Sequence, residues 1–270
     1  MRDRVGCANL LTGTSIRQNM VRKKFLNVGL LVIAGVLLLT VGCSSCIQRK
    51  LLYFPSHEAG NNGLVPWTNN GEIIGYARIV ESPRNVWLMI HGNGGQASDR
   101  VYALPCFSPD DSVFVLEYPG YGMRKGVPSK KAFNQAAKEA YLLLRNTYPK
   151  IPVCVVAESI GNGPACTLAA LTPPPDKFVL IVPFEKLSLV ARDHFPAFLV
   201  SLLLRDDWDN VEALSHYKGP IDMFAAEADI VIPAVHAKAL ADAIPSAKFT
   251  LIPGGHNEWS ENGRVSIRNP

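Results

Sequence analysis

The feature that most constrains the fold is a series of short apolar runs without alternating polar positions. The runs span residues 86–90, 112–117, 151–156 and 178–182. Runs of this length are typical of strands that are covered on both faces. Segments with a helical spacing of apolar residues, such as 129–148 and 160–171, lie between them. Strands that alternate with helices predict an α/β protein with a doubly wound, mostly parallel sheet.

Weaker patterns complete a domain that we place at residues 50–270. We expect an extended segment over 50–55, an early antiparallel strand over 72–80, strands over 221–225 and 248–252, and a helix over 232–244. Ser129 is expected to cap the first long helix. The interval 184–219 is longer than a plain crossover, and we interpret it as a short helical cap over the site. An ordinary crossover helix with an insertion is the alternative.

The N-terminal segment differs from this domain in its charge. The first 50 residues contain eight Lys and Arg and one Asp, whereas residues 51–270 contain 19 Lys and Arg and 22 Asp and Glu. The net charge of +4 therefore comes from the N-terminal segment alone. A mildly acidic body argues against a nucleic-acid-binding domain.

Residues 1–46 have the pattern of a signal peptide or a membrane anchor. The basic cluster Arg22 to Lys24 precedes an uncharged stretch from Phe25 to Gln48, and Met20 is an alternative start that would give a compact basic region. The apolar core of about 17 residues lies between the usual lengths of a signal and of a membrane span. The basic side is expected to stay in the cytoplasm, so the body crosses the membrane.

Small residues before Cys43 resemble a bacterial lipoprotein signal, in which this cysteine is lipidated. Thr40 departs from the Leu that is usual at this position, and an uncleaved single span is the alternative. In either case we expect a protein anchored at the periplasmic side of the bacterial cell envelope, through a lipid or through the segment itself. Cys106, Cys154 and Cys166 lie in predicted core elements, where a free thiol packs as a small apolar group.

The strongest chemical signal is Ser159, which follows a buried run and precedes a helix rich in small residues. Ala157 and Gly161 lie two positions before and after it, so the pattern is Ala-x-Ser-x-Gly. A sharp strand-to-helix turn of this kind exposes the hydroxyl of a nucleophile. The alternative is a serine that only caps the helix.

Two turns are expected to surround this serine. Residues 91–95, His-Gly-Asn-Gly-Gly, follow an earlier buried run, and the turn can supply the backbone N–H of Asn93 to an oxyanion hole. The N–H of Ile160 would be the second donor. One such donor is worth roughly 3 kcal/mol in the transition state.

An acid and a histidine follow the last two predicted strands. Asp229 can orient the imidazole of His256, which would take the proton of Ser159, while Glu227 and Asp222 are the competing acids. The chain order Ser, Asp, His is that of hydrolases with this type of turn. The other histidines have no ligand spacing, so we predict no metal site.

The ordered motifs resemble the α/β-hydrolase superfamily, in its membrane-anchored serine-hydrolase branch with His-Gly-Asn turns. The motifs are Lys50 to Pro55, His91 to Gly95, Glu117 to Gly122, Glu158 to Gly161, Asp229 to Pro233, and Gly254 to His256. The resemblance covers about residues 50–258. It departs from the branch at Ala157 and in the short tail after His256, which leaves little room for a final helix.

The resemblance implies a serine hydrolase that cleaves esters or thioesters of a small-molecule acyl substrate, without a cofactor. An amidase or peptidase of the same fold, and a non-catalytic lipoprotein that uses the fold as a binding module, are the alternatives. The complete set of Ser159, Asp229 and His256 favours the enzyme. We expect no nucleic acid among its partners.

Overall fold

The fold was analysed in a computed structural model, which describes residues 46–58 and 63–268. The chain divides into two units, Met1–Ile47 and Gln48–Pro270, and the second unit contains the sheet and its helices. The predicted signal or anchor, with Cys43, lies almost wholly outside the described residues. Within the described ranges, no helix has the length and apolar character that a membrane crossing requires.

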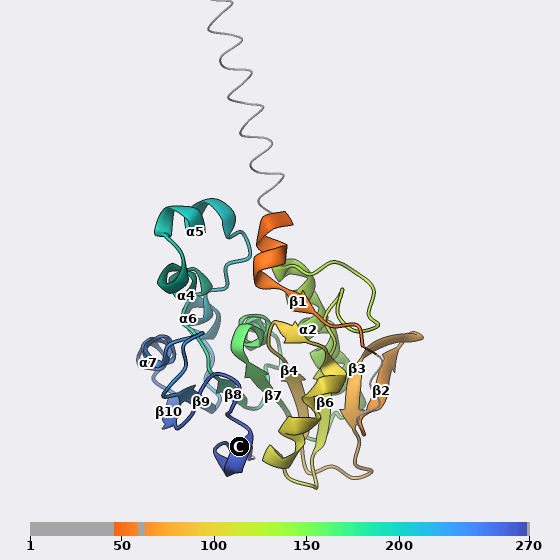
Figure 1. The fold of residues 1–270 in the computed structure, drawn as a ribbon. Coiled ribbons are helices and arrows are strands. Elements are labelled where there is room, and N and C mark those ends of the chain that lie inside the picture. Colours follow the sequence, from red (N-terminus) through yellow and green to blue (C-terminus); the bar gives the residue numbers. More distant parts are fainter. Residues whose placement is uncertain (1–45, 59–62, 269–270) are drawn as a thin grey trace, which may run out of the picture. The chain divides into compact units, whose positions relative to one another are not determined.

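The core of the second unit is one eight-stranded sheet with the order β10-β9-β8-β7-β4-β6-β3-β2 (Figure 1). The six strands from β10 to β6 run parallel, and only β3 and β2 are antiparallel to their neighbours. This confirms the predicted α/β class. The strands are β2 (Val65–Asn69), β3 (Glu72–Arg78), β4 (Val86–Ile90), β6 (Ser112–Leu116), β7 (Val153–Glu158), β8 (Phe178–Ile181), β9 (Ile221–Ala226) and β10 (Ala247–Ile252).

Strand β2 was not predicted from the sequence, although its turn carries a clear signal. Asn70 and Gly71 connect it to β3, and both have positive φ angles, 49° and 78°. Asn-Gly pairs in this conformation are typical of two-residue hairpins. The hairpin ends the sheet on the β3 side.

The helices cover the sheet and connect its parallel strands. They are η1 (Ala97–Cys106), α2 (Lys130–Thr147), η2 (Ser159–Gly161), α3 (Asn162–Cys166), η3 (Thr167–Ala170), α4 (Leu187–His194), α5 (Ala197–Leu203), α6 (Asn210–Leu214), α7 (Ala234–Ala243) and η4 (Glu261–Gly263). Ser129 caps α2 as predicted, because its Oγ accepts the N–H of Ala132 at 3.2 Å. The interval between β8 and β9 contains α4, α5 and α6.

One local prediction was wrong. Residues 48–52 are helical rather than extended, and the extended part is only the short strand β1 (Phe54–Pro55), which pairs with β5 (Gly94–Gly95). The predicted helix over 160–171 is confirmed as a helical segment, which is divided into η2, α3 and η3. A Cβ atom at Gly163 would lie 2.5 Å from the ring of Trp208, so a residue with a side chain does not fit there. That contact depends on a residue far away in the sequence, so local spacing did not reveal it.

Candidate active site

Ser159 follows β7 directly, at the carboxyl end of the parallel strands. It has a positive φ of 54°, which is uncommon for a residue other than glycine and is the conformation of a sharp nucleophile turn. The strand β7 lies beside β4, and the chain leaves β4 toward β6 on its other side. Crevices at such a switch point are the usual ligand sites of doubly wound sheets.

The tight turn at Ser159 depends on a close approach of two backbone segments. A Cβ atom at Gly161 would lie 2.3 Å from the carbonyl oxygen of Ile90 and 2.5 Å from that of His91, so only glycine fits. Asn162, fully buried, donates from Nδ2 to the carbonyl oxygens of Ser159 at 2.7 Å and of Ile181 at 2.9 Å. These contacts hold the strained backbone in place. Ala157 is buried in β7 and paired with its neighbours, so the departure from glycine there leaves the turn intact.

The structure brings Ser159, His256 and Asp229 together. Nε2 of His256 lies 2.9 Å from Oγ of Ser159, and Nδ1 lies 2.7 Å from Oδ2 of Asp229. The other oxygen of Asp229 accepts the backbone N–H groups of Val231 and Ile232, each at 2.8 Å. The carboxylate is thus fixed by its own loop and points one oxygen at the imidazole. This network assigns a proton to Nδ1 and leaves Nε2 to accept the hydroxyl proton of Ser159.

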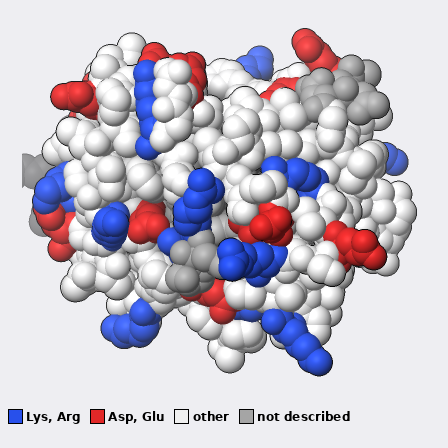
Figure 2. Space-filling view, turned by 90° about the horizontal axis from the view of Figure 1, so that it is seen from below, with Lys and Arg blue, Asp and Glu red and all other residues white. Residues whose placement is uncertain are grey.

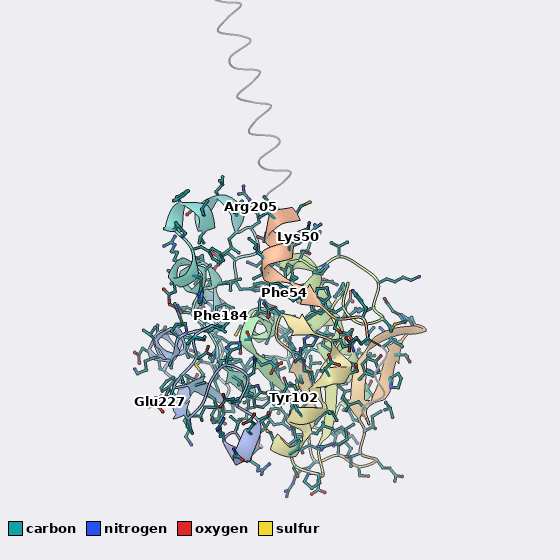
Figure 3. The ribbon with its side chains drawn as sticks, viewed as in Figure 1. Lys50, Phe54, Tyr102, Phe184, Arg205 and Glu227 are labelled. Atoms are coloured by element: carbon teal, nitrogen blue, oxygen red, sulfur yellow. The ribbon has the colours of Figure 1, made fainter. Side chains whose placement is uncertain are left out.

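The competing acids are directed elsewhere. Asp222 forms an ion pair with Lys177 at 2.7 Å. Glu227 is exposed at the end of β9 and is labelled in Figure 3. The geometry therefore singles out Asp229 as the carboxylate partner of His256.

The turn after β4 passes close to the serine. A Cβ atom at Gly92 would lie 3.5 Å from Cβ of Ser159. The side-chain amide of Asn93 donates to the carbonyl of Leu52 at 3.1 Å, and its backbone carbonyl accepts from Phe54 and Tyr121. The side chain of Asn93 is therefore committed to the scaffold, and any role in binding an oxyanion falls to its backbone N–H. Ile160 is buried immediately after the serine.

Glu158, next to the serine, is a buried carboxylate whose role the sequence analysis did not identify. It accepts hydrogen bonds from the N–H of Gly92 at 3.1 Å, from the hydroxyl of Tyr102 at 2.8 Å and from Nε1 of Trp259 at 2.9 Å. Its nearest cation is Arg100, at 3.5 Å. Burial alone would raise the pKa of Glu158, but Arg100 and the hydrogen bonds from Gly92 and Tyr102 outweigh it, so the pKa is lowered. One charge thus holds three separate segments around the serine.

His91 and its aromatic neighbours support the turn after β4. His91 is fully buried, and its Nδ1 lies 2.8 Å from the carbonyl oxygen of Gly92. The hydroxyl of Tyr118 donates to the carbonyl of His91 at 2.6 Å, and that of Tyr121 donates to the carbonyl of Asn93 at 2.8 Å. Glu117 is buried too and accepts the N–H of Ala97. The carboxylate of Glu117 is therefore part of the scaffold around the turn.

Among the residues that the structure describes, no cluster of three or more His, Cys, Asp or Glu is arranged to hold a metal ion. The three cysteines placed in core elements are buried and free. Burial raises the pKa of the Cys154 thiol to about 12, so it stays protonated as an inert packing group.

Several known proteins resemble this chain in sequence. No protein-family model matches the chain. An uncharacterized protein of Mycobacterium tuberculosis is 29% identical over 262 residues, which cover 87% of this chain and 91% of that protein. An α/β-hydrolase domain-containing protein of Arabidopsis thaliana, WAV2, is 23% identical over 89% of this chain and 90% of its own length. The lysophosphatidylserine lipase ABHD12 of Danio rerio is 26% identical over 64% of this chain but only 50% of its own length.

Solved structures resemble most of this chain in fold. An esterase of Pyrococcus furiosus matches with a TM-score of 0.58 and 13% identity, over 78% of this chain and 91% of its own. An α/β hydrolase of Vibrio vulnificus matches with a TM-score of 0.58 and 19% identity, over 76% and 79%. An enol-lactonase of Burkholderia xenovorans matches with a TM-score of 0.53 and 11% identity, over 70% and 92%. With its parallel sheet and its turn at Ser159, the chain has the α/β-hydrolase fold.

Proposed function

We propose that the protein is a serine hydrolase that cleaves acyl esters or thioesters. The observation that carries the proposal is the position of His256, whose two ring nitrogens lie 2.9 Å from Ser159 Oγ and 2.7 Å from Asp229 Oδ2. A base within hydrogen-bond reach of a hydroxyl, itself oriented by a carboxylate, is the arrangement that activates a serine. Relatives of the same fold whose names state an activity include a lipase, an esterase and an enol-lactonase.

The reaction would proceed in two halves. Oγ of Ser159 attacks the acyl carbonyl while Nε2 of His256 takes the hydroxyl proton, and the resulting imidazolium donates it to the leaving alcohol or thiol. A water molecule then attacks the acyl-enzyme and gives a proton to the same nitrogen, which returns it to Oγ of Ser159 as the acyl bond breaks and the acid is released. Asp229 holds the tautomer and stabilises the imidazolium. No cofactor takes part in either half.

The negative oxygen of each tetrahedral intermediate would be stabilised by two backbone N–H groups. We assign them to Ile160, which follows the nucleophile, and to Asn93 in the turn after β4. The proximity of that turn to Ser159 supports the assignment. Loss of one such donor costs roughly 3 kcal/mol in the transition state.

A fluorophosphonate probe tests the nucleophile. The wild-type protein should be labelled, and Ser159→Ala should abolish labelling. Ser201→Ala is the matched control, because Ser201 is an exposed serine of α5 whose hydroxyl only bonds its own helix. Labelling that survives Ser159→Ala would contradict the proposal, and a wild-type protein that is never labelled would favour a non-catalytic binding module.

A substrate panel separates ester cleavage from the amidase alternative. An ester, a thioester and an anilide that share one acyl group should be compared at equal concentration. We expect turnover of the ester and the thioester, and none of the anilide. Comparable kcat/KM for the anilide would make the protein an amidase or peptidase.

We also propose that the N-terminal segment anchors the protein at the periplasmic side of a bacterial envelope. The basic cluster before the uncharged stretch 25–48 supports this orientation. Mass spectrometry of the protein from its native membrane distinguishes the two forms of anchoring. A lipidated N-terminal Cys43 would establish a lipoprotein, whereas an intact segment before it would establish a single span.

A further inference from the structure

Helix α5 carries apolar side chains on both of its sides, and Ser201 is its single polar residue. Its inner side chains, Leu199, Val200 and Leu203, face the body of the protein, whereas Phe198 and Leu202 point outward and are 70% and 48% exposed. A helix that is apolar all around is normally buried on every side. The outer side of α5 therefore lacks the second apolar surface that its sequence is suited to contact.

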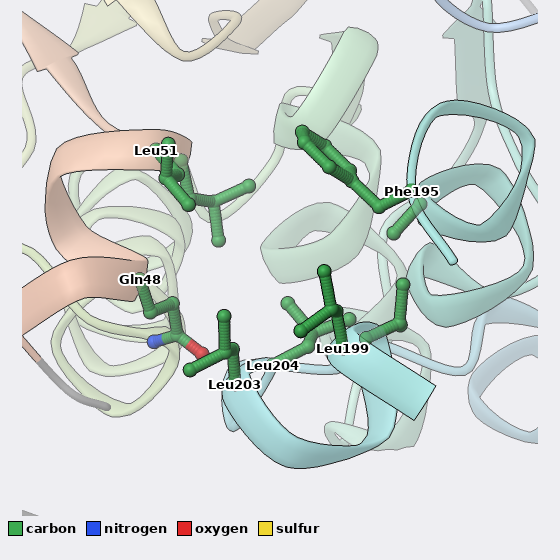
Figure 4. A pocket seen from close by; sticks show the side chains of 9 residues that line it. Gln48, Leu51, Phe195, Leu199, Leu203 and Leu204 are labelled. Atoms are coloured by element: carbon green, nitrogen blue, oxygen red, sulfur yellow. The ribbon is translucent and has the colours of Figure 1, made fainter. Parts of the chain in front are cut away.

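Neighbouring side chains extend this surface. Phe195, just before α5, is 50% exposed, and Leu51, in the helical segment 48–52, is 55% exposed. Both also line an apolar cavity of about 250 Å³ between that segment and α5 (Figure 4). We call Leu51, Phe195, Phe198 and Leu202 the cap face. Exposed apolar side chains gathered on neighbouring elements are typical of binding surfaces.

Hydrogen bonds fix the point at which the chain enters the second unit, beside the cap face. The Gln48 side chain accepts the backbone N–H groups of Arg205 and Asp206, and its Nε2 donates to the Asp206 carboxylate at 2.7 Å. Tyr53 donates to the same carboxylate at 2.7 Å. Although polar, Gln48 is buried. The start of the unit is therefore attached to the residues that follow α5.

The length of the connection limits how far a membrane can be from this point. The uncharged stretch begins at Phe25, and only five residue steps separate Cys43 from Gln48. An extended chain of that length spans at most about 18 Å. If residues 25–43 or a lipid on Cys43 lie in a membrane, the bilayer surface lies within about that distance of Gln48.

The charges around the cap face favour an anionic surface. Arg49, Lys50 and Arg205 are exposed, and Lys50 and Arg205 lie at the same end of the molecule (Figure 3). Figure 2 shows the molecule from below, away from the end where Figure 3 labels Lys50 and Arg205, and positive and negative side chains are interspersed there. Basic residues beside an apolar helix are typical of surfaces that lie on bilayers with anionic lipids.

We propose that the cap face docks on the surface of an anionic lipid bilayer, with Phe198 and Leu202 below the headgroups and Lys50 and Arg205 among them. The inference rests on the proposed N-terminal anchoring and not on the proposed hydrolase activity. It assigns a lipid contact to the α4–α5 region in addition to the anchor. The opening of the apolar cavity would then face lipid rather than water.

Tryptophan fluorescence with brominated lipids tests the contact in the full chain, reconstituted in vesicles of phosphatidylcholine and phosphatidylglycerol. All four native tryptophans are buried, so Phe198→Trp adds the one exposed reporter. Ile79→Trp is the matched control. Ile79 is 55% exposed. It precedes Val80, whose N–H donates to Oγ of Ser112 at the amino end of β6, whereas α4 and α5 follow the carboxyl end of β8.

We expect the Phe198→Trp emission to lie at shorter wavelength than that of Ile79→Trp and to lose intensity with bromines. Surface-bound amphipathic faces lie about 5–10 Å into the headgroup boundary, so bromines near the top of the acyl chains should quench more than bromines near their ends. Emission from Phe198→Trp that bromines leave unchanged in a chain that floats with the vesicles would overturn the inference. A chain that does not float would overturn both the docking and the anchoring.

Two further measurements separate lipid from other partners. A second copy of the chain on this face would shift the Phe198→Trp emission without bromine quenching, in proportion to protein density, and would overturn the proposal. Within the same reporter variant, Lys50→Gln and Arg205→Gln should each lower the ratio of docked to undocked molecules by about fivefold in anionic vesicles. They should have no effect in neutral vesicles, and equal effects in both would contradict the electrostatic part.

Discussion

Two histidines in this molecule each bridge two side chains, and the difference between the partners gives them opposite chemistry. His256 lies between one carboxylate, Asp229, and one neutral hydroxyl, Ser159. His236, on α7, lies between two carboxylates, with Nδ1 2.9 Å from Glu185 and Nε2 2.9 Å from Asp193. Both rings are mostly buried.

The second partner of each ring determines which of its nitrogens carry a proton. A hydroxyl can donate to Nε2 of His256, which leaves that nitrogen unprotonated and able to act as a base. Two carboxylates can only accept, so both nitrogens of His236 must donate. Burial would lower the pKa of His236, but the hydrogen bonds to Asp193 and Glu185 outweigh it and the pKa is raised. His236 is thus a structural cation that ties α7 to α4, and His256 is the candidate base.

Replacing each histidine by glutamine should give the largest contrast. With a triad of this kind, His256→Gln should lower kcat for a chromogenic ester by about 10⁶-fold, because no other group is placed to take the serine proton. His236→Gln should keep most of the activity and lower the melting temperature instead. Equal losses of kcat in the two variants would remove the distinction between them.

The partner carboxylates give the next contrast. Asp229→Asn should lower kcat by about 10⁴-fold, since an amide no longer selects the Nδ1–H tautomer of His256. Asp193→Asn removes an exposed carboxylate from His236 and should leave kcat near the wild-type value. Steady-state kinetics on both variants checks this, and a mild effect at Asp229 would mean that the geometry around His256 is not used for catalysis.

The sequence predicted the triad better than it predicted what holds the triad in place. Ser159, Asp229 and His256 each follow a strand with a clear apolar pattern, and parallel strands bring their carboxyl ends to one edge. Glu158 and Asn162 were not identified, because their partners come from residues far along the chain, such as Trp259 and Ile181. Local periodicity carries no signal for contacts between distant segments.

The same limit explains the local errors in the fold. The helical residues 48–52 are held by a contact of Gln48 with the backbone after α5, more than 150 residues away, which local spacing does not reveal. The missed strand β2, by contrast, had a local signal in Asn70-Gly71 that a search for hairpins would have found. The interval 184–219 was interpreted as a cap from its length alone, and its three helices, of eight, seven and five residues, are too short to be placed from the spacing of apolar residues.

Glu158 can be compared with Asp229: Asp229 orients the imidazole of His256, whereas Glu158 orients the backbone N–H of Gly92. Glu158→Gln should lower kcat by about 10²-fold with little change in KM, because the N–H of Gly92 and the turn with Asn93 would shift relative to Ser159. Glu227→Gln, at an exposed carboxylate, is the control and should be silent. The rate of fluorophosphonate labelling should fall in parallel with kcat. A loss of melting temperature with an unchanged labelling rate would restrict Glu158 to a structural role.

The smallest effect we expect is a pH dependence of stability that belongs to His236 alone. Because its pKa is higher in the folded than in the unfolded chain, where it is about 6.5, the ring binds a proton more tightly when folded. The contribution of the protonated ring to the free energy of unfolding is therefore fully present below the unfolded pKa and disappears as the pH rises through the folded pKa. Melting temperatures of wild type and His236→Gln, measured from pH 5 upward, should differ most at acid pH and converge at alkaline pH. A difference that grows with pH would mean that the ring is neutral in the folded protein, which would make it resemble His256 and not its opposite.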